Sequence, residues 1–250
     1  MTLRATRLVT MTHGRVSVPP VTIFMALHGE FKAGKSWFAQ TGEAPTLLIE
    51  SEHGGSAAAS SRQIGWDWTR FGPPVHDGQW DTAVARISTL DEMDFVLQRS
   101  RSVPWQTIAV DSISDIASRT LRAQAGPNGA NTIHHYARLK QQLTAAAQDA
   151  AARAHDPGGP FTVWLCRSIL GDDGVMRPHI AGSFRTDIAY EVDLIAHITG
   201  SGPTRQLICA EHPGYVAGHR LGPTFPSVIT DVTIGRVRAS AQAIGGQDDI

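Results

Sequence analysis

The chain has 250 residues, of which 42% are hydrophobic, enough for one α/β domain with a sizeable core and too few for two full-size catalytic domains. Its formal net charge of −1 gives no global attraction to nucleic acid, so such a contact would need a local basic patch. Two cysteines exclude a Cys-rich scaffold, and with no visible apolar span or signal peptide they indicate a cytoplasmic setting without a membrane partner.

Apolar, β-rich runs recur along the whole chain and predict buried strands. Helical patterns alternate with them, which predicts an α/β fold with a mostly parallel central sheet flanked by helices on both faces. The later strands follow one another more closely and predict an antiparallel C-terminal extension. The predicted strands are residues 22–27, 46–50, 107–110, 161–165, 192–198, 206–209 and 228–234, and the predicted helices are 90–99, 113–123 and 133–152.

Gly- and Pro-rich breakers interrupt this pattern at several places. They mark loops and no domain boundary, because the strand pattern continues across them. We therefore expect a single domain over residues 1–238. The small, polar segment 239–250 is expected to be a flexible C-terminal tail.

Directly after the first apolar run lies a complete G-x-x-x-x-G-K-[ST] phosphate loop. Its glycines allow the backbone N–H groups to converge on phosphates, its lysine supplies a point charge, and its serine offers a hydroxyl to Mg²⁺. The motif predicts binding of a nucleoside triphosphate with Mg²⁺. The expected contact residues are Gly29, Glu30, Phe31, Lys32, Ala33, Gly34, Lys35, Ser36 and the adjoining Trp37.

Two later runs end in acids. The strand 107–110 leads into Asp111, which is typical of a Walker B element that holds the Mg²⁺ water shell; the alternative is the cap of the next helix. The strand 46–50 leads into Glu50-Ser51-Glu52-His53, where a carboxylate can orient and deprotonate an attacking water. Either acid could instead be a cap, and Glu52 is favoured as the catalytic one.

In this order of phosphate loop, very short helix, acid-x-Glu-His strand end and Val-Asp-Ser strand end, the chain resembles the ATPase core of RecA-type recombinases. It is similar, in its compactness, to the phage RecA-like ATPases associated with single-strand annealing. The resemblance covers roughly residues 20–200 and implies a RecA-like P-loop NTPase fold, ATP as nucleotide, Lys35 and Glu52 in catalysis, and Ser36 and Asp111 at Mg²⁺. It further implies a homo-oligomer, single-stranded DNA, phage recombination or replication proteins as partners, and the host cytoplasm.

Two arginines extend the implied catalytic set. Arg167 follows the strand 161–165, where the family carries a sensor of the γ-phosphate, although an amide or imidazole is usual there. It would either stabilise charge on the phosphoryl oxygens or make a salt bridge at the sheet edge. Arg220 resembles a basic residue that phage relatives carry near the end of the core; it could reach a neighbouring subunit's nucleotide or be a surface arginine.

The polar segment 171–185 corresponds to a DNA-contacting loop of the recombinases. Arg177, His179 and Arg185 could bind backbone phosphates while Phe184 stacks on a base. The ordinary alternative is a solvated β-hairpin.

Other aromatic and imidazole groups have structural explanations. Trp66, Trp68 and Trp80 crowd into the segment 62–81, which we expect to begin as a helix; packing under a loop is favoured over base stacking. His53, His134 and His135 lack the companion ligands of a metal site, so solvated or core histidines are the preferred interpretation.

Two other functions fit a phosphate loop on a doubly wound sheet. A nucleotide or small-molecule kinase shares both features but needs a lid and a second substrate pocket. A nucleotide-gated assembly or loader protein would bind ATP with little turnover, and the bulky Phe31 keeps this alternative open.

Overall fold

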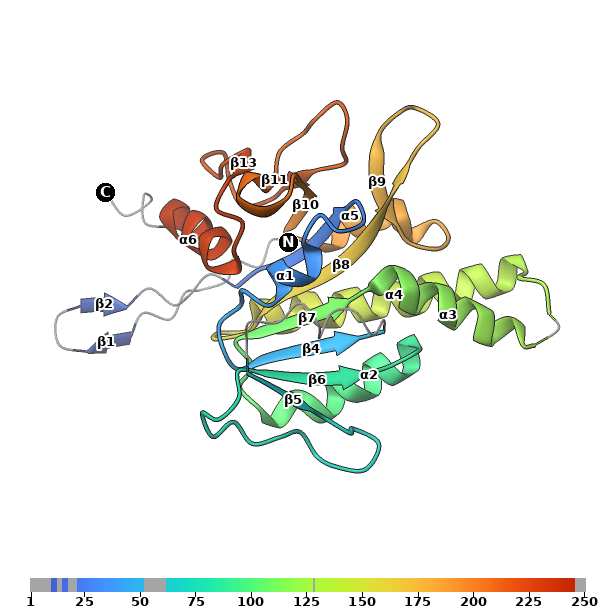
Figure 1. Cartoon of the computed structure of the whole chain (residues 1–250), viewed down its shortest axis with the longest axis horizontal. Coiled ribbons are helices and arrows are strands. Elements are labelled where there is room, and N and C mark those ends of the chain that lie inside the picture. The colour runs from blue at the N-terminus through green and yellow to red at the C-terminus, as the bar shows by residue number, and fades with distance from the viewer. Residues whose placement is uncertain (1–9, 13–14, 18–21, 52–61, 128, 246–250) are drawn as a thin grey trace, which may run out of the picture.

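The computed structural model describes residues 10–12, 15–17, 22–51, 62–127 and 129–245. A central mixed sheet dominates the molecule, and a separate two-stranded sheet pairs β1 (Thr10–Thr12) with β2 (Arg15–Ser17) (Figure 1). Within the described residues, no helix combines the length and apolar character that crossing a membrane requires.

The central sheet has the order β13-β11-β10-β3-β8-β7-β4-β6-β5. Its seven strands from β10 to β5 are all parallel in the described part of the chain. This confirms the predicted mostly parallel α/β sheet. The parallel strands are β3 (Phe24–Gly29), β4 (Thr46–Glu50), β5 (Gln63–Gly65), β6 (Thr82–Arg86), β7 (Thr107–Asp111), β8 (Phe161–Leu170) and β10 (Leu194–Thr199).

Antiparallel strands extend the sheet, as the sequence predicts. At the β10 end, β11 (Gln206–Ile208) and β13 (Val228–Ile229) continue the main order, while β12 (Gly218–His219) pairs with β10. In addition, β9 (Met176–His179) folds back on the long β8 as a hairpin. At this end, β10 therefore separates the extension from β3, the strand that precedes the phosphate loop.

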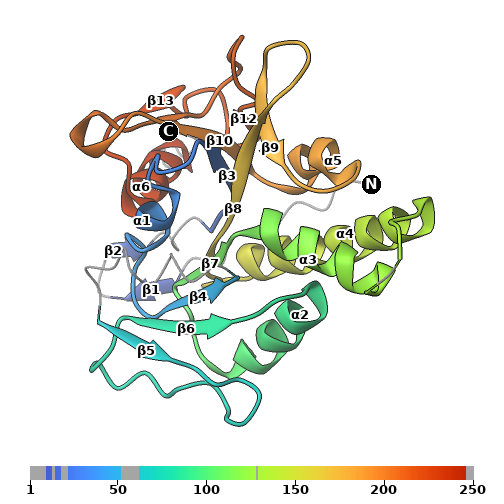
Figure 2. The same ribbon diagram turned by 45° about the vertical axis from the view of Figure 1, so that its right-hand side comes forward.

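Helices cover both faces of the sheet (Figure 2). Four of them pack into one core with Trp164 and Leu47, and the other two pack into a second core with Leu27 and Leu165. The apolar residues of strands such as β3 and β4 are buried throughout, because both faces are covered. The first set is α2 (Leu90–Arg99), α3 (Ile113–Ala125), α4 (Ile133–His155) and α5 (Phe184–Glu191); the second is α1 (Lys35–Ala39) and α6 (Ile234–Gly245).

Local signals explain where several helices begin. Thr89 and Glu92 form a reciprocal capping box at the start of α2, a motif that satisfies two free backbone donors. At the start of α3, the Ser112 hydroxyl accepts a hydrogen bond from the Asp115 N–H. The helix cap at this point is therefore Ser112 and not Asp111, which was the alternative role for that acid.

Two structural predictions were wrong. The segment from residue 62 begins as the strand β5 and not as a helix. Residues 239–245 belong to α6 and not to a flexible tail: Ala241 is buried in the second core, and the Arg238 guanidinium donates to Glu43 Oε2 at 2.9 Å and to the Gln106 carbonyl at 2.5 Å. The small and polar composition that predicted a tail is tolerated because only one face of α6 is buried.

Parallel strands bring their carboxyl ends to one edge of the sheet, and their register decides which residues meet there. Gly29, at the end of β3, lies beside Arg167 of β8. Glu50, at the end of β4, lies between Asp111 of β7 and Arg86 of β6. Gly29 of the phosphate loop, the predicted metal ligand Asp111, Glu50 and Arg167 therefore share this edge.

Candidate functional site

The phosphate loop connects β3 to α1 at the carboxyl edge. Lys32 (φ 64°) and Gly34 (φ 101°) both have left-handed backbone conformations, which turn the chain tightly enough for α1 to begin at Lys35. Glu30, Phe31 and Lys32 are exposed, whereas Ala33 is buried. The loop therefore has the tight turn and open outer surface that phosphate binding needs.

Lys35 and Ser36 connect the loop to its surroundings. Lys35 Nζ donates to the carbonyl oxygens of Gly29 and Glu30, both at 2.8 Å. The Ser36 hydroxyl donates to Asp111 Oδ2 at 2.5 Å, although 75 residues separate the two. An ammonium, a hydroxyl and a carboxylate thus converge, and this set of groups fits a Mg²⁺-bound triphosphate.

Glu50 and Glu52 are the two candidate catalytic acids. Glu52, like His53, lies outside the described residues. Glu50 is 1% exposed, and its Oε2 lies 3.4 Å from Nε of Arg86. Glu50 and Arg86 line a cavity of about 180 Å³ together with Trp68 and Arg119. A second carboxylate thus stands beside Asp111, and which acid serves hydrolysis stays a prediction.

Arg167 lies beside Gly29 on the neighbouring strand. Its backbone N–H donates to the Ser114 hydroxyl at 3.0 Å, and its guanidinium lies 3.8 Å from Asp115 Oδ1. Asp115 also pairs with Arg119 at 2.6 Å. The side chain is about half exposed at the sheet edge, so the ion-pair alternative is realised and the γ-phosphate role stays a prediction.

The segment proposed for DNA contact forms the β8–β9 hairpin and the start of α5. Arg177 makes an ion pair with Asp173 at 2.5 Å across the hairpin turn, while His179 and Arg185 are exposed. Phe184 is fully buried in the core with α5, so the expectation that it stacks on a base was wrong. Apolar packing of the helix start outweighs its position in a polar loop.

Arg220 lies at the opposite edge of the sheet. It follows β12, whose His219 pairs with Leu194 at the start of β10. Its guanidinium donates to the carbonyl oxygens of Tyr190 at 3.1 Å and Val192 at 2.7 Å. Any contact of Arg220 with a γ-phosphate would therefore require a neighbouring copy, and that role stays a prediction.

A buried histidine pair below the phosphate loop was missed by the sequence analysis. His28 Nε2 lies 2.7 Å from the Val216 carbonyl, so this nitrogen carries the proton. Its Nδ1 then accepts from the Ser168 hydroxyl at 2.9 Å, with Nδ1 of His197 at 3.3 Å. The His197 ring stacks on Tyr215 with centroids 3.9 Å apart.

Burial is the main reason that both rings stay neutral. It lowers the pKa of His28 to about 3, against the opposing bond to Val216, and the charges of His197 and Lys35 add to the lowering. It also lowers the pKa of His197 to about 4, helped by the charge of Lys35. The signal available in the sequence was a histidine inside an apolar strand, next to Gly29.

A second missed residue, Arg205, contacts the phosphate loop from the segment before β11. Its Nε donates to the Ala33 carbonyl at 3.2 Å, and its guanidinium carbon lies 4.8 Å from the Trp37 ring centroid. No local motif marks Arg205, because the contact spans 172 residues. It brings a positive charge to the side of the loop that faces away from Asp111.

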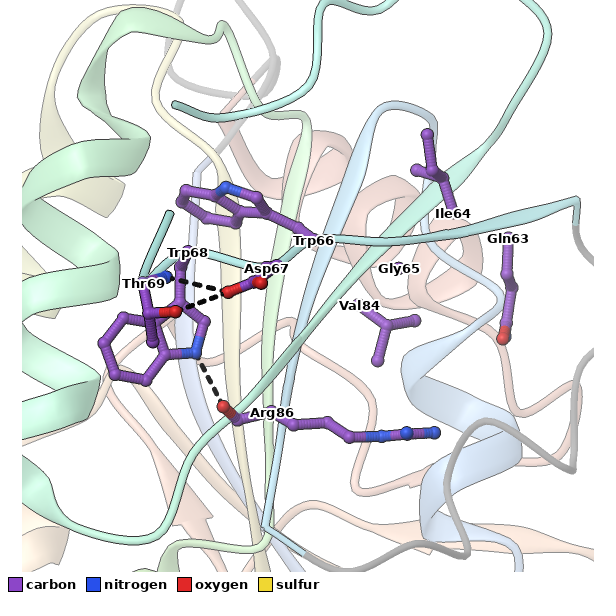
Figure 3. A pocket seen from close by; sticks show the side chains of 9 residues that line it. All are labelled: Gln63, Ile64, Gly65, Trp66, Asp67, Trp68, Thr69, Val84 and Arg86. Atoms are coloured by element: carbon purple, nitrogen blue, oxygen red, sulfur yellow. Dashed lines mark hydrogen bonds between the residues drawn. The ribbon is translucent and has the colours of Figure 1, made fainter. Parts of the chain in front are cut away.

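The tryptophan-rich segment packs at the outer edge of the sheet. Trp66 and Trp80 are 5% exposed, as the packing interpretation predicts. Trp68 is half-buried, and its Nε1 donates to the Arg86 carbonyl at 2.6 Å (Figure 3). Trp66, Trp68 and Arg86 line a cavity of about 520 Å³, which shares Trp68 and Arg86 with the smaller cavity beside Glu50.

His134 and His135 show no arrangement of metal ligands. His134 is exposed at the start of α4, and His135 Nδ1 accepts from the Thr132 N–H at 3.2 Å as part of that helix cap. Among the residues that the structure describes, no group of three or more His, Cys, Asp or Glu side chains could hold a metal ion.

No protein-family model and no curated protein matches the chain. Among solved structures, it is similar to the RadB recombinase (14% identity, TM-score 0.42, covering 76% of this chain and 80% of that one). It is also similar to a KaiC-like protein from Pyrococcus horikoshii OT3 (12%, 0.42, 76% and 78%). A third is the genome packaging NTPase of Sulfolobus turreted icosahedral virus 2 in complex with ATP-gammaS (11%, 0.35, 73% and 77%). These values describe a likeness and say nothing about activity.

Proposed function

We propose that this chain binds a Mg²⁺–nucleoside triphosphate at the carboxyl edge of its sheet and hydrolyses it, with ATP as the nucleotide. The observation that supports this most directly is the hydrogen bond from Ser36 Oγ to Asp111 Oδ2. It brings the phosphate loop and the Walker B acid together from distant parts of the chain. No fold-level likeness is needed for this step, because the residue types and their placement supply it.

The loop amides and Lys35 would hold the phosphates, and Ser36 and Asp111 would hold Mg²⁺ or its water shell. When bound, the ion neutralises negative charge on the phosphate oxygens. Lys35 is already beside the loop carbonyls of Gly29 and Glu30, so it needs only a local change of side-chain partners to reach a phosphate.

Hydrolysis needs a base that orients the attacking water and accepts its proton. We assign this role to Glu52, which follows the end of β4. Glu50 is the alternative, since it is buried beside Asp111 and its carboxylate faces the cavity shared with Arg86. A glutamine at the correct position removes the proton acceptor and keeps the side-chain shape, so it should preserve nucleotide binding while hydrolysis is lost.

We further propose that ATP state is coupled to single-stranded DNA in recombination or annealing of the phage type, with assembly into a homo-oligomer. The exposed His179 and Arg185 beside the β8–β9 hairpin support a DNA contact. The hairpin also contacts residues 214–216, which are hydrogen-bonded to β3 through His28. The Met176 N–H donates to the Gly214 carbonyl at 2.9 Å, and the Val216 N–H donates to the Met176 carbonyl at 2.8 Å. Through Val216 and His28, the hairpin is two contacts from the phosphate loop.

The test is Mg²⁺-dependent ATP hydrolysis by the wild type and Lys35→Ala, each titrated with single-stranded DNA. We expect hydrolysis in the wild type, stimulation by DNA, and a loss of about 10³-fold in the variant. Hydrolysis without DNA stimulation would remove the recombination role and keep the ATPase. Phosphoryl transfer only to a small acceptor would indicate a kinase that uses the 520 Å³ cavity, and binding without turnover would indicate an assembly protein.

A further inference from the structure

Helix α1 has two flanks that differ in chemistry. On the flank toward β7, Ser36 meets the carboxylate of Asp111. On the flank toward β11, Trp37 meets the guanidinium of Arg205. Mg²⁺ would bind on the acidic flank, because Ser36 and Asp111, which would hold it, lie there. The rest of a nucleotide must therefore leave the loop along another direction.

Arg205 is held against the loop by three features. Its Nε donates to the Ala33 carbonyl at 3.2 Å. Its guanidinium carbon lies over the Trp37 ring, 4.8 Å from the ring centroid. A Cβ atom at Gly34 would lie 2.4 Å from Arg205 Nε, so the close approach depends on that glycine. Arg205 and Trp37 thus form a partly exposed cation–π pair that adjoins the phosphate loop.

We propose that Trp37 and Arg205 form a stacking platform for the nucleobase of the bound nucleotide. This rests on the proposed nucleotide site and adds the base to it. A guanidinium plane and an indole ring both present a face to which any base can stack, and such stacking is tolerant of base identity. The larger purines gain more contact on this platform than pyrimidines, and base-edge hydrogen bonds are not required.

The proposal makes Arg205 more than a support for the loop. A purely structural Arg205 would affect binding of the triphosphate group and of the whole nucleotide to the same extent. A platform affects only ligands that carry a base. Inorganic tripolyphosphate has the phosphate chain and no base, so it separates the two roles.

The experiment measures Mg²⁺-dependent binding of ATP and of tripolyphosphate by isothermal titration calorimetry. Trp37→Ala is expected to weaken ATP binding about 10-fold and to change tripolyphosphate binding less than about twofold. Trp37→Phe keeps an aromatic face and should stay within about threefold of the wild type for ATP. Arg205→Lys keeps the charge and loses the plane, so it too should weaken ATP selectively.

The control is another aromatic–arginine pair. Phe95 and Arg99 on α2 form a comparable contact at 5.4 Å, and Phe95→Ala should leave both ligands unaffected. In the wild type, ATP and GTP should bind within about threefold of each other and CTP more weakly.

Three results from the variants and from CTP would overturn the platform. They are unchanged ATP affinity in Trp37→Ala, an equal loss of ATP and tripolyphosphate in both Trp37→Ala and Arg205→Lys, and equal affinity for CTP and ATP. If the wild type binds tripolyphosphate and ATP with the same affinity, the base adds nothing to binding, and this result refutes the platform but not the nucleotide site. A wild type that binds neither ligand refutes the nucleotide site itself, and the platform with it.

Discussion

The two sides of the phosphate loop carry opposite kinds of chemistry. Toward β7 and β4 lie two carboxylates and a hydroxyl, those of Asp111, Glu50 and Ser36. Toward β10 and β11, the neighbours are the neutral rings of His28 and His197, with the guanidinium of Arg205 on the loop itself. A cation bound on the first side would meet carboxylates, while the buried imidazoles near Lys35 carry no charge. The difference places the groups that suit a metal ion on one side of the loop and neutral or cationic groups on the other.

The largest effect that tests this contrast is expected at Asp111. Asp111→Asn keeps a hydrogen-bond acceptor for Ser36 and removes the charge that would hold Mg²⁺, so hydrolysis should fall by about 10²- to 10³-fold. Steady-state phosphate release at saturating Mg²⁺ and ATP measures it. Asp91→Asn changes an exposed acid on α2 that accepts from Gln142 at 2.8 Å and serves as control. Wild-type turnover in Asp111→Asn would contradict the assignment of the metal side.

The neutral histidines toward β10 should make the unfolding free energy of the protein fall at acidic pH. The unfolded chain protonates His28 near its ordinary pKa of 6.5, whereas the folded chain does so only near about 3. The unfolded state therefore binds more protons below pH 6.5, and stability that is complete above this pH is lost as the pH falls. His28 alone should cost about 3 kcal/mol of unfolding free energy by pH 4.

Urea unfolding between pH 7.5 and pH 4 measures this loss. His28→Gln, which cannot be protonated, should flatten the dependence, while His134→Gln at an exposed position should keep the wild-type slope. His197, which faces Lys35 and the exposed His212, should add to the wild-type loss. An unfolding free energy that is the same at pH 7.5 and pH 5 would show that the pair is not buried in neutral form.

The smallest effect is expected at Arg167, between the two sides. Its ion pair with Asp115 is long and half exposed, so Arg167→Ala should change the unfolding free energy by less than about 1 kcal/mol. If that pair is its main use, hydrolysis should stay within about threefold of the wild type. A 100-fold loss of turnover with unchanged stability would instead make Arg167 a residue that acts on the γ-phosphate.

The side of the loop toward Asp111 could be predicted from the sequence, and the opposite side, which holds His28, His197 and Arg205, could not, for a physical reason. Gly29 to Ser36 is a continuous motif, and Asp111 ends a recognisable apolar strand. By contrast, Arg205 reaches Ala33 across 172 residues, and no spacing rule connects them. Parallel strands were predictable because they are buried on both faces, while the buried position of Phe184 depends on how α5 packs.

Weak local signals account for the other failures. The strand β6 was missed because its sequence, Thr-Ala-Val-Ala-Arg, is short and rich in alanine, although it is buried at four of five positions. The helix α6 was missed for a similar reason, since its small residues resemble those of a tail, although the helix packs into the same core as α1. Tertiary contacts decide the structure where intrinsic preference is weak.

The position of α6 has a consequence for synthesis of the chain. Ile234 N–H donates to the Thr41 hydroxyl at 2.9 Å, and Arg238 holds Glu43 and the Gln106 carbonyl. These contacts support the segments after α1 and before β7. Residues near 40 and 106 are therefore stabilised by partners that come after residue 230 in the sequence. During translation, the phosphate loop would emerge early and lack these contacts until the ribosome has made residue 238. The proposed nucleotide site would therefore be fully supported only after about 200 further residues have followed the loop.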